Sequence, residues 1–309
     1  AAAGKTLELA VPLGALPGIG TGARISIKVM SSESGREPAG FPAAGPLTVS
    51  VPQLSTARSI LEITDPAGDD HGPGTYRYPT DRVFDPGSFD ITRFTVSDGG
   101  SNYVFTFRVN GAINNPWGSG IGLSLQTFDV YIDIDPGAGT GARSLLEGRN
   151  AVTRPEDGWE YAIWVEGWNR KVFVPNEAGR PVELPGSPTV LVDQASREVS
   201  VLVPKSTLAA GTPPERWGFI AAVLSQEGYP SAGVRRVRDV KPEAEQWKIG
   251  GGTGSVNDTR ILDLAWDGEP AQESLLANPA PGGSGGADRL PFEAFAAVPF
   301  VTAGTGDGE

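Results

Sequence analysis

The sequence predicts an all-β protein, an antiparallel, jelly-roll-like β-sandwich. Two observations carry this prediction: apolar and polar residues alternate with a period of two in several short segments, and turn-forming residues separate those segments. Of the 309 residues, 42 are Gly and 27 are Pro, without the G-X-Y period of collagen. No long amphipathic helix is visible. Many short strands joined by frequent turns are typical of a sandwich.

The clearest strand covers residues 103–109. Its apolar residues fall on one face and its polar residues on the other, as a half-buried strand requires. The apolar face comprises Tyr103, Phe105, Phe107 and Val109, and the polar face includes Thr106 and Arg108. Residues 128–134 alternate in the same way, with Phe128, Val130, Ile132 and Ile134 against Asp129, Tyr131 and Asp133.

Further elements follow from weaker patterns. Strands are expected over residues 159–166, 199–203 and 217–224, with Gly, Pro, Asn and Asp between them. Short helical turns are expected over residues 144–150 and 270–276.

An internal half-repeat indicates a second, incomplete domain. Residues 5–35 and 197–228 both read as a strand, a Val-Pro pair, a short turn ending in Leu, and a strand that ends in a polar Ser/Glu/Gly loop. Two strands cannot bury a sheet face alone. We therefore interpret residues 1–52 as the C-terminal strands of a preceding, truncated β domain. The alternative is an N-terminal hairpin that docks on the main sandwich.

The remaining boundaries follow from composition. We expect the main sandwich over residues 53–277 and a Gly/Pro-rich linker with an acidic tail over residues 278–309. Within that last part, residues 289–301 contain an apolar stretch too short to span a bilayer. We interpret this stretch as an edge strand or docking segment, and the alternative is a membrane or partner anchor.

The composition excludes several functions. There is no Cys, so thiol nucleophiles, disulfides and cysteine zinc sites are absent, and His71 is the single histidine. The net charge of −12 argues against a nucleic-acid partner, which needs a basic face. No run of 18 apolar residues exists, so we expect no transmembrane segment. An acidic surface suits cations or neutral ligands such as glycans.

Acidic residues cluster near glycines and prolines in one region of the chain. They are Asp65, Asp69, Asp70 and Asp90. Like charges repel in a folded turn unless a counter-charge is present, and Ca²⁺ binds Asp side chains in irregular loops. We therefore predict a Ca²⁺ site, with Asp133 as a further candidate ligand. The alternative is a solvated turn with Asx caps and no metal.

Several motifs in order resemble a known family. They are DPAGDDHGPGTYRYPTDRVFDPGSFDITRF (65–94), NPWGSG (115–120), LQTFDVYIDID (125–135), EGRNA (147–151), AIWVEGW (162–168) and EQWKIGGG (245–252). Residues 60–276 resemble the C-terminal accessory domain of glucodextranases and the matching region of amylopullulanases, which is related to family 9 carbohydrate-binding modules. The preceding LELAVPLGAL resembles the end of the domain before it in such enzymes.

The resemblance implies a secreted or bacterial cell-surface module that binds glycan or cell-wall polysaccharide and contains structural calcium. It does not imply catalysis, because the hydrolase domain of those enzymes lies outside the matched segment. We therefore expect this chain not to be an enzyme, although Asp133 and Asp135 as a carboxylate pair leave a glycosidase as a further alternative. A structural cell-envelope subunit, acting through contacts with other envelope proteins and not through sugar binding, is the main alternative function.

Sugar binding requires flat aromatic faces, because the C–H face of a pyranose stacks on them. Of the seven Trp residues, Trp217 begins an apolar strand and is predicted to be in the core. Trp117 lies in a Gly/Pro loop, Trp168 ends a strand, and Trp247 precedes three glycines. These three are the candidate ligand-binding platforms, and the alternative is that they pack in the core or pin loops.

Overall fold

The computed structural model describes residues 24–31, 39–41, 45–50, 57–228, 233, 236–279 and 290–303. The chain forms two compact units, residues 1–58 and residues 59–309. The first part of the half-repeat, residues 5–17, lies outside the described residues.

The N-terminal unit contains two short antiparallel sheets. Strand β1 (Arg24–Ile27) pairs with β4 (Leu47–Ser50), and β2 (Val29–Ser31) pairs with β3 (Ala39–Phe41). Among the side chains described in this unit, Ile27, Met30 and Leu47 are exposed. These strands therefore do not bury an apolar face within the part of the unit that the structure describes.

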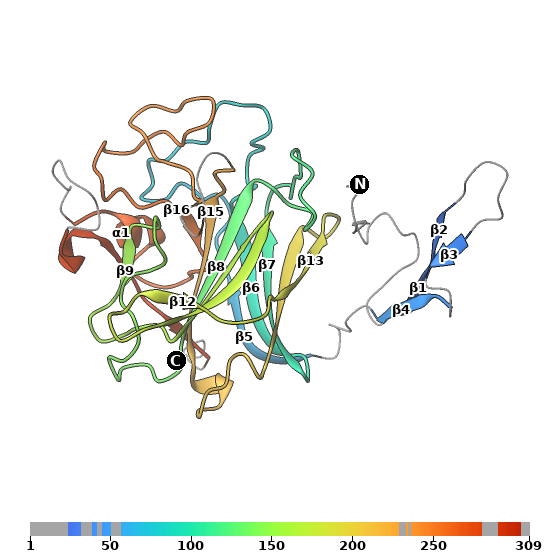
Figure 1. Ribbon diagram of the computed structural model, residues 1–309. Helices are drawn as coiled ribbons and strands as arrows, with labels where there is room; N and C mark the ends of the chain where they lie inside the picture. The colour runs from blue at the N-terminus through green and yellow to red at the C-terminus, as the bar shows by residue number, and fades with distance from the viewer. Residues whose placement is uncertain are drawn as a thin grey trace. The chain divides into compact units, whose positions relative to one another are not determined.

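The second unit begins with a five-stranded antiparallel sheet (Figure 1). Its order is β13 (Thr189–Asp193), β14 (Glu198–Pro204), β7 (Asn102–Val109), β6 (Ile91–Asp98) and β5 (Arg58–Thr64). The prediction for β7 is confirmed: Phe105, Phe107 and Val109 are buried, whereas Arg108 is exposed.

The second sheet has seven strands. Its order is β12 (Pro181–Glu183), β11 (Asn169–Pro175), β10 (Tyr161–Glu166), β8 (Gln126–Asp133), β15 (Gly218–Ser225) and β16 (Ile261–Leu264), with β18 (Val301–Thr302) also paired to β15. Every named pairing in this sheet is antiparallel.

The main core lies between the two sheets. Phe107 of β7 meets Phe128 of β8 with ring centres 4.9 Å apart, and Phe105 meets Phe219 of β15 at 6.4 Å. Trp217 is buried in the same core, as predicted. The all-β sandwich is therefore confirmed, because aromatic residues from both sheets fill the space between them.

The outer face of the larger sheet is also buried, which the alternation in residues 128–134 did not predict. Every residue of β8 is buried, including Asp129. Arg149 neutralises this carboxylate through two hydrogen bonds, from Nε to Oδ2 (2.6 Å) and from Nη2 to Oδ1 (2.9 Å). Asp129 thus faces a second core and not solvent, because a buried charge is tolerated when it is paired.

Three short elements build this second core. Strand β9 (Ala151–Thr153) pairs in parallel with β17 (Ala296–Val298), and helix α1 (Gln272–Leu276) buries Leu276 in the same cluster. Helix α1 confirms the helical turn predicted over residues 270–276. Residues 144–150 contain only a turn and no helix. Two 3₁₀ turns, Pro214–Arg216 and Phe292–Ala294, complete the described elements.

Long loops converge at one end of the sandwich (Figure 1). Residues 65–90, cyan in the figure, lie beside residues 236–260, which are orange: Arg77 pairs with Gly250, and the amide of Thr80 donates to the carbonyl of Glu245 (3.0 Å). No helix within the described residues is long and apolar enough to cross a bilayer. The loop end of the sandwich carries both candidate sites.

Candidate metal centre and aromatic pocket

Four buried or half-buried aspartates meet where the two sheets adjoin. Asp65 follows β5, Asp90 precedes β6, and Asp69 lies in the loop between them. Asp263 lies within β16, the edge strand of the larger sheet. Ligand oxygens of Asp65, Asp69 and Asp263 lie within 4.8 Å of one another. The structure thus brings together two predicted ligands, Asp65 and Asp69, with Asp263, which the sequence prediction missed. Asp90 lies near enough for its charge to act on Asp65.

Backbone amides hold these carboxylates in place. Asp65 Oδ1 accepts from the amide of Trp266 (2.7 Å), and Asp263 Oδ2 accepts from the amide of Ile91 (2.5 Å). Asp90 Oδ2 accepts from the amide of Gly68 (2.8 Å). Each of these bonds joins segments far apart in the sequence. The acidic cluster therefore connects β5 and β6 of one sheet to β16 of the other.

Three other oxygens of this cluster lack partners. Asp65 Oδ2, Asp69 Oδ1 and Asp90 Oδ1 are buried and accept no hydrogen bond from any described residue. No Arg or Lys in the described part of the chain forms an ion pair with any of the four aspartates. Buried, unpaired carboxylate oxygens are costly, and this group of carboxylates could hold a cation.

Burial and mutual repulsion disfavour ionisation of the cluster. Burial, together with the negative charges of Asp69, Asp90 and Asp267, raises the pKa of Asp65 to about 9. Burial likewise raises the pKa of Asp69 to about 6, with added repulsion from Asp90. Burial also raises the pKa of Asp263 well above its ordinary value. A bound divalent cation would reverse these effects, because it stabilises the charged carboxylates.

Asp70 does not join this cluster. Its Oδ2 accepts a hydrogen bond from the hydroxyl of Tyr78, and its Oδ1 lies 3.9 Å from Nε2 of His71. The Tyr78 hydroxyl in turn accepts from the amide of Phe89 (3.1 Å). Asp70 therefore holds the loop over residues 65–90 in place through its contact with Tyr78, although it neighbours Asp69 in the sequence.

Asp133 lies in a separate acidic group with Asp135 and Glu160. Burial raises the pKa of Asp133 to about 7, and Glu160 adds repulsion. Here, however, the carboxylates have local donors: the amide of Asp135 donates to Asp133 (2.9 Å), and the hydroxyl of Thr140 donates to both Asp135 and Glu160. This group contains no unpartnered buried oxygen among the described residues, so it fits a cation less well than the first cluster.

The first cluster fits a hard cation. Its four side chains offer only oxygen ligands, which Ca²⁺ prefers. Because some of them come from loops, their arrangement is irregular, and Ca²⁺ tolerates irregular coordination. No Cys exists in the chain, and His71 Nδ1 donates to the carbonyl of Tyr76 (3.1 Å) outside the cluster. Soft-metal chemistry therefore has no ligand set here.

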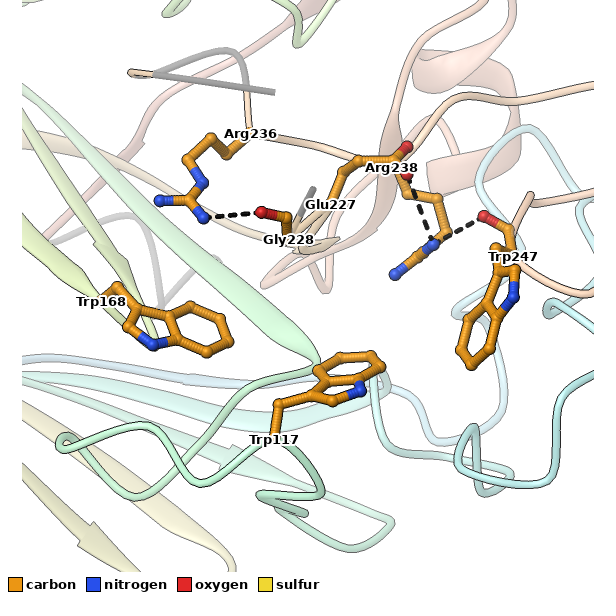
Figure 2. A pocket seen from close by; sticks show the side chains of 7 residues that line it. All are labelled: Trp117, Trp168, Glu227, Gly228, Arg236, Arg238 and Trp247. Carbon is orange, nitrogen blue, oxygen red and sulfur yellow. Dashed lines mark hydrogen bonds and ion pairs between the residues drawn. The ribbon is translucent and has the colours of Figure 1, made fainter. Parts of the chain in front are cut away.

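The three tryptophans singled out in the sequence line one pocket of about 610 Å³ (Figure 2). They come from three separate segments: Trp117 from the loop before β8, Trp168 from the turn between β10 and β11, and Trp247 from the loop after β15. Their exposed fractions are 41%, 43% and 37%. The fold thus gathers indoles that the sequence separates by up to 130 residues.

Two of the indoles form a continuous aromatic wall. The ring centres of Trp117 and Trp247 are 6.1 Å apart and their planes are inclined by 54°. Trp247 is backed by Phe84 at 6.0 Å in an edge-to-face arrangement. Packing against a buried ring holds Trp247 in one orientation, so its exposed surface is available without reorganisation.

Arg238 fixes the loop that carries Trp247. Its Nη1 donates to the carbonyl of Trp247 (2.6 Å) and its Nη2 to that of Gln226 (2.7 Å). Glu227 lies 3.8 Å from Nη1 of Arg238 and 2.7 Å from Nζ of Lys248. This buried network supports the pocket wall, because the guanidinium of Arg238 donates its hydrogen bonds to backbone carbonyls of the protein itself.

Trp168 stands on a tight hairpin. Glu166 pairs with Asn169, so Gly167 and Trp168 form the turn itself. The Arg236 guanidinium carbon lies 5.7 Å from the centre of the Trp168 ring, and its Nη2 donates to the carbonyl of Gly228 (2.8 Å). The indole therefore contacts the guanidinium of Arg236, and both side chains line the pocket (Figure 2).

Sequence reasoning missed the polar half of this pocket. Glu227, Arg236 and Arg238 line it but belong to a segment without a recognisable motif. The available signal was the run Arg235, Arg236 and Arg238 after a predicted strand in an acidic chain. Asp263 was also missed. An Asp inside the apolar strand Ile261–Leu264 is unusual, because a buried carboxylate requires a hydrogen-bond or charged partner.

Flat apolar faces combined with fixed polar groups suit an amphipathic, hydroxyl-rich ligand. The fold and the pocket together are typical of a β-sandwich binding module, with a candidate ligand pocket among the loops at one end. The family model described as the C-terminal binding-module, SLH-like, of glucodextranase matches residues 60–284, and the chain belongs to this family. No curated protein matches the sequence.

Proposed function

We propose that this chain is a non-catalytic accessory module that binds glycan or cell-wall polysaccharide in the pocket of Trp117, Trp168 and Trp247. The convergence of three exposed indoles in one pocket is the observation that carries the proposal. The C–H faces of pyranose rings stack on indole, and Trp has the largest such surface. Membership of a family of binding modules from glucodextranase supports an α-glucan as the ligand class.

The SLH-like description of the family supports a location at the bacterial cell surface. There the module would hold a secreted α-glucan-active enzyme or an envelope protein against its polysaccharide. The same description also favours a second function, a structural envelope subunit that acts through protein contacts. The two functions differ in one respect: only the first requires the pocket to bind sugar.

Trp117→Ala tests the sugar-binding function. We expect isomaltotriose and dextran to bind the wild-type chain in titration calorimetry and affinity electrophoresis, and binding to be reduced at least roughly tenfold in the variant, because one stacking face is lost. Phe292→Ala is the matched control, since Phe292 is an equally exposed aromatic (41%) outside the pocket. Wild-type protein that binds neither these saccharides nor isolated cell wall would favour the envelope-subunit function.

We further propose that Ca²⁺ binds among Asp65, Asp69, Asp90 and Asp263 and stabilises the junction of the two sheets. The unpartnered oxygens of Asp65, Asp69 and Asp90 support this site. When bound, the ion supplies the missing positive charge, and the aspartates hold the loop over residues 65–90 against β16.

Chelation tests the calcium site. EDTA should lower the melting temperature of the wild-type chain, and Asp69→Ala should abolish that sensitivity, because the cluster then lacks one ligand. Asp193→Asn is a control, since Asp193 is the exposed last residue of β13 and accepts from the amide of Ala195 (2.9 Å). An EDTA effect retained in Asp69→Ala but lost in Asp133→Asn would move the site to the second acidic group.

A further inference from the structure

Residues 65–90, which we call the acidic loop, begin and end at the acidic cluster. Asp65 and Asp69 lie near the start of the loop, and Asp90 is its last residue. The amide of Gly68 donates to Asp90 Oδ2 (2.8 Å), so the two ends of the loop are joined directly. The buried oxygens without a partner among the described residues come from both ends as well. The proposed cation would therefore bind both ends of one loop.

The middle of the acidic loop supports the loop that carries Trp247. The amide of Thr80 donates to the carbonyl of Glu245 (3.0 Å), and the amide of Asp81 donates to the carbonyl of Gln246 (3.3 Å). The Gln246 side chain in turn donates to Asp81 Oδ2 (3.0 Å). These bonds hold the two residues that directly precede Trp247 in the sequence. The backbone position of this indole thus depends on the acidic loop.

A line of aromatic rings connects the acidic cluster to the pocket. Phe89, which directly precedes Asp90, is fully buried and stacks on Phe84 with ring centres 6.4 Å apart. Phe84 contacts Trp247 at 6.0 Å, and Trp247 contacts Trp117 at 6.1 Å. Closely packed side chains transmit displacements to their neighbours. A shift at the end of the acidic loop therefore reaches the wall of the pocket.

These contacts converge on Phe84, which is buried. The guanidinium carbon of Arg238 lies 4.9 Å from the centre of its ring, and Arg238 donates to the carbonyl of Trp247 (2.6 Å). Phe84 thus contacts both the indole and the side chain that fixes the backbone of that indole. The amide of Phe84 donates to the carbonyl of Asp81 (3.2 Å), so the acidic loop sets the place of Phe84 itself.

We infer that Phe84 positions Trp247 and thereby couples the proposed cation site to the proposed sugar-binding pocket. This inference rests on the proposed function and gives its regulation. Without the cation, the attraction that draws the carboxylates at the two ends of the acidic loop together is lost, and the loop no longer fixes Phe84. Trp247 then has to be ordered when the sugar binds, which weakens the affinity.

Titration calorimetry with isomaltotriose in Ca²⁺ and in EDTA tests the coupling, at a temperature where circular dichroism shows both forms to be folded. We expect the wild-type chain to bind the sugar roughly fivefold or more tightly in Ca²⁺. Coupling between two sites is reciprocal, so saturating isomaltotriose should tighten Ca²⁺ binding by the same factor. A purely structural cation would raise the melting temperature without moving either affinity.

Phe84→Leu tests the route, because an apolar side chain remains while the ring that contacts Trp247 and Arg238 is lost. EDTA should still lower the melting temperature of this variant, but its sugar affinity in Ca²⁺ should fall to the level in EDTA. Phe94→Leu is the matched control. Phe94 is also buried, but it packs on Phe107 (4.9 Å) in the main core and does not line the pocket. Its ratio of affinities in Ca²⁺ and EDTA should equal that of the wild type.

The outcomes separate the inference from the proposed function. If EDTA lowers the melting temperature and the sugar binds through Trp117, but with equal affinity in Ca²⁺ and EDTA, both proposed sites stand and the inference is wrong. A wild-type ratio that persists in Phe84→Leu, or is lost in Phe94→Leu, contradicts the role of Phe84. If no saccharide binds, or if EDTA has no effect on the melting temperature, that part of the proposed function is overturned together with the inference.

Discussion

Neighbouring residues in the acidic loop have different roles. Asp69 directs an unpartnered oxygen into the cluster with Asp65 and Asp90, whereas Asp70 binds the hydroxyl of Tyr78. Composition cannot separate them, because both are aspartates in a Gly/Pro-rich loop. The difference lies in burial and partners, and it determines which substitutions affect a bound cation and which affect only the loop.

The pKa values of the cluster predict a pH dependence. Asp65 and Asp69 have pKa values of about 9 and about 6, raised by burial above the ordinary 3.8. Without metal, the native state binds more protons than the unfolded state between pH 3.8 and about pH 9. The free energy of unfolding therefore falls as the pH rises through this range. Ca²⁺ requires the ionised form. The difference in melting temperature between Ca²⁺ and EDTA should therefore grow from about pH 5 to about pH 8.

Scanning calorimetry at several pH values measures this difference directly. The subtraction removes contributions from groups that do not contact the ion. Asp69→Asn should flatten the curve, because Asn has no proton to lose in this range. A difference that stays constant with pH, or shrinks as the pH rises, would contradict the assignment of the ion to this cluster.

Among the elements, the hairpin of β10 and β11 controls the position of Trp168. Its turn consists of Gly167 and Trp168, and Gly167 lies directly against the loop that carries Trp117. A Cβ at residue 167 would approach the carbonyl oxygen of Leu123 to 2.5 Å and Cβ of Ser119 to 3.0 Å. Two pocket walls are therefore in contact at this glycine, and the geometry of the pocket depends on its small size.

Gly167→Ala should weaken sugar binding more than it weakens the fold. The added methyl group pushes the hairpin from the loop, and overpacking of this kind costs about 1–3 kcal/mol of stability. Titration calorimetry with isomaltotriose and urea unfolding measure the two effects. Gly120→Ala is the matched control: it lies in the same loop, and a Cβ there meets nothing within 4 Å. Equal binding by both variants would show that the hairpin does not set the pocket.

For the main unit as a whole, the segment 290–303 completes the second core. Strand β17 pairs in parallel with β9, and β18 pairs with β15 of the larger sheet. Ala296 and Val298 are buried, whereas Ala297 between them is exposed. The outer face of the larger sheet is thus covered by a segment that follows a Gly-rich stretch in the sequence.

Val298→Asp should destabilise the main unit by about 3 kcal/mol or more, because an unpaired charge enters the second core. Ala297→Asp, one residue away on the exposed face, should change the free energy of unfolding by less than about 0.5 kcal/mol. Urea unfolding followed by tryptophan fluorescence compares the two. Similar values for both variants would mean that this segment does not pack on the sheet in solution.

The sequence by itself determined the fold class and much of the candidate binding surface. Period-2 alternation placed β7 and its buried face correctly, because one face of that strand packs on the core and the other meets solvent. For β8 the same alternation predicted a polar, half-buried face, and this was wrong, because Asp129 on that face is buried in an ion pair with Arg149. A pattern of polarity cannot reveal that a charged residue has a buried partner of opposite charge.

The tertiary structure decided what the sequence left as separate residues. Trp117, Trp168 and Trp247 were identifiable as exposed because Gly, Pro and strand ends surround them, yet only the fold places them in one pocket. Asp263 joins Asp65 only because the edge strands of the two sheets adjoin. Local patterns determine elements and exposure, whereas a site is a set of long-range contacts that exists only after the chain has packed.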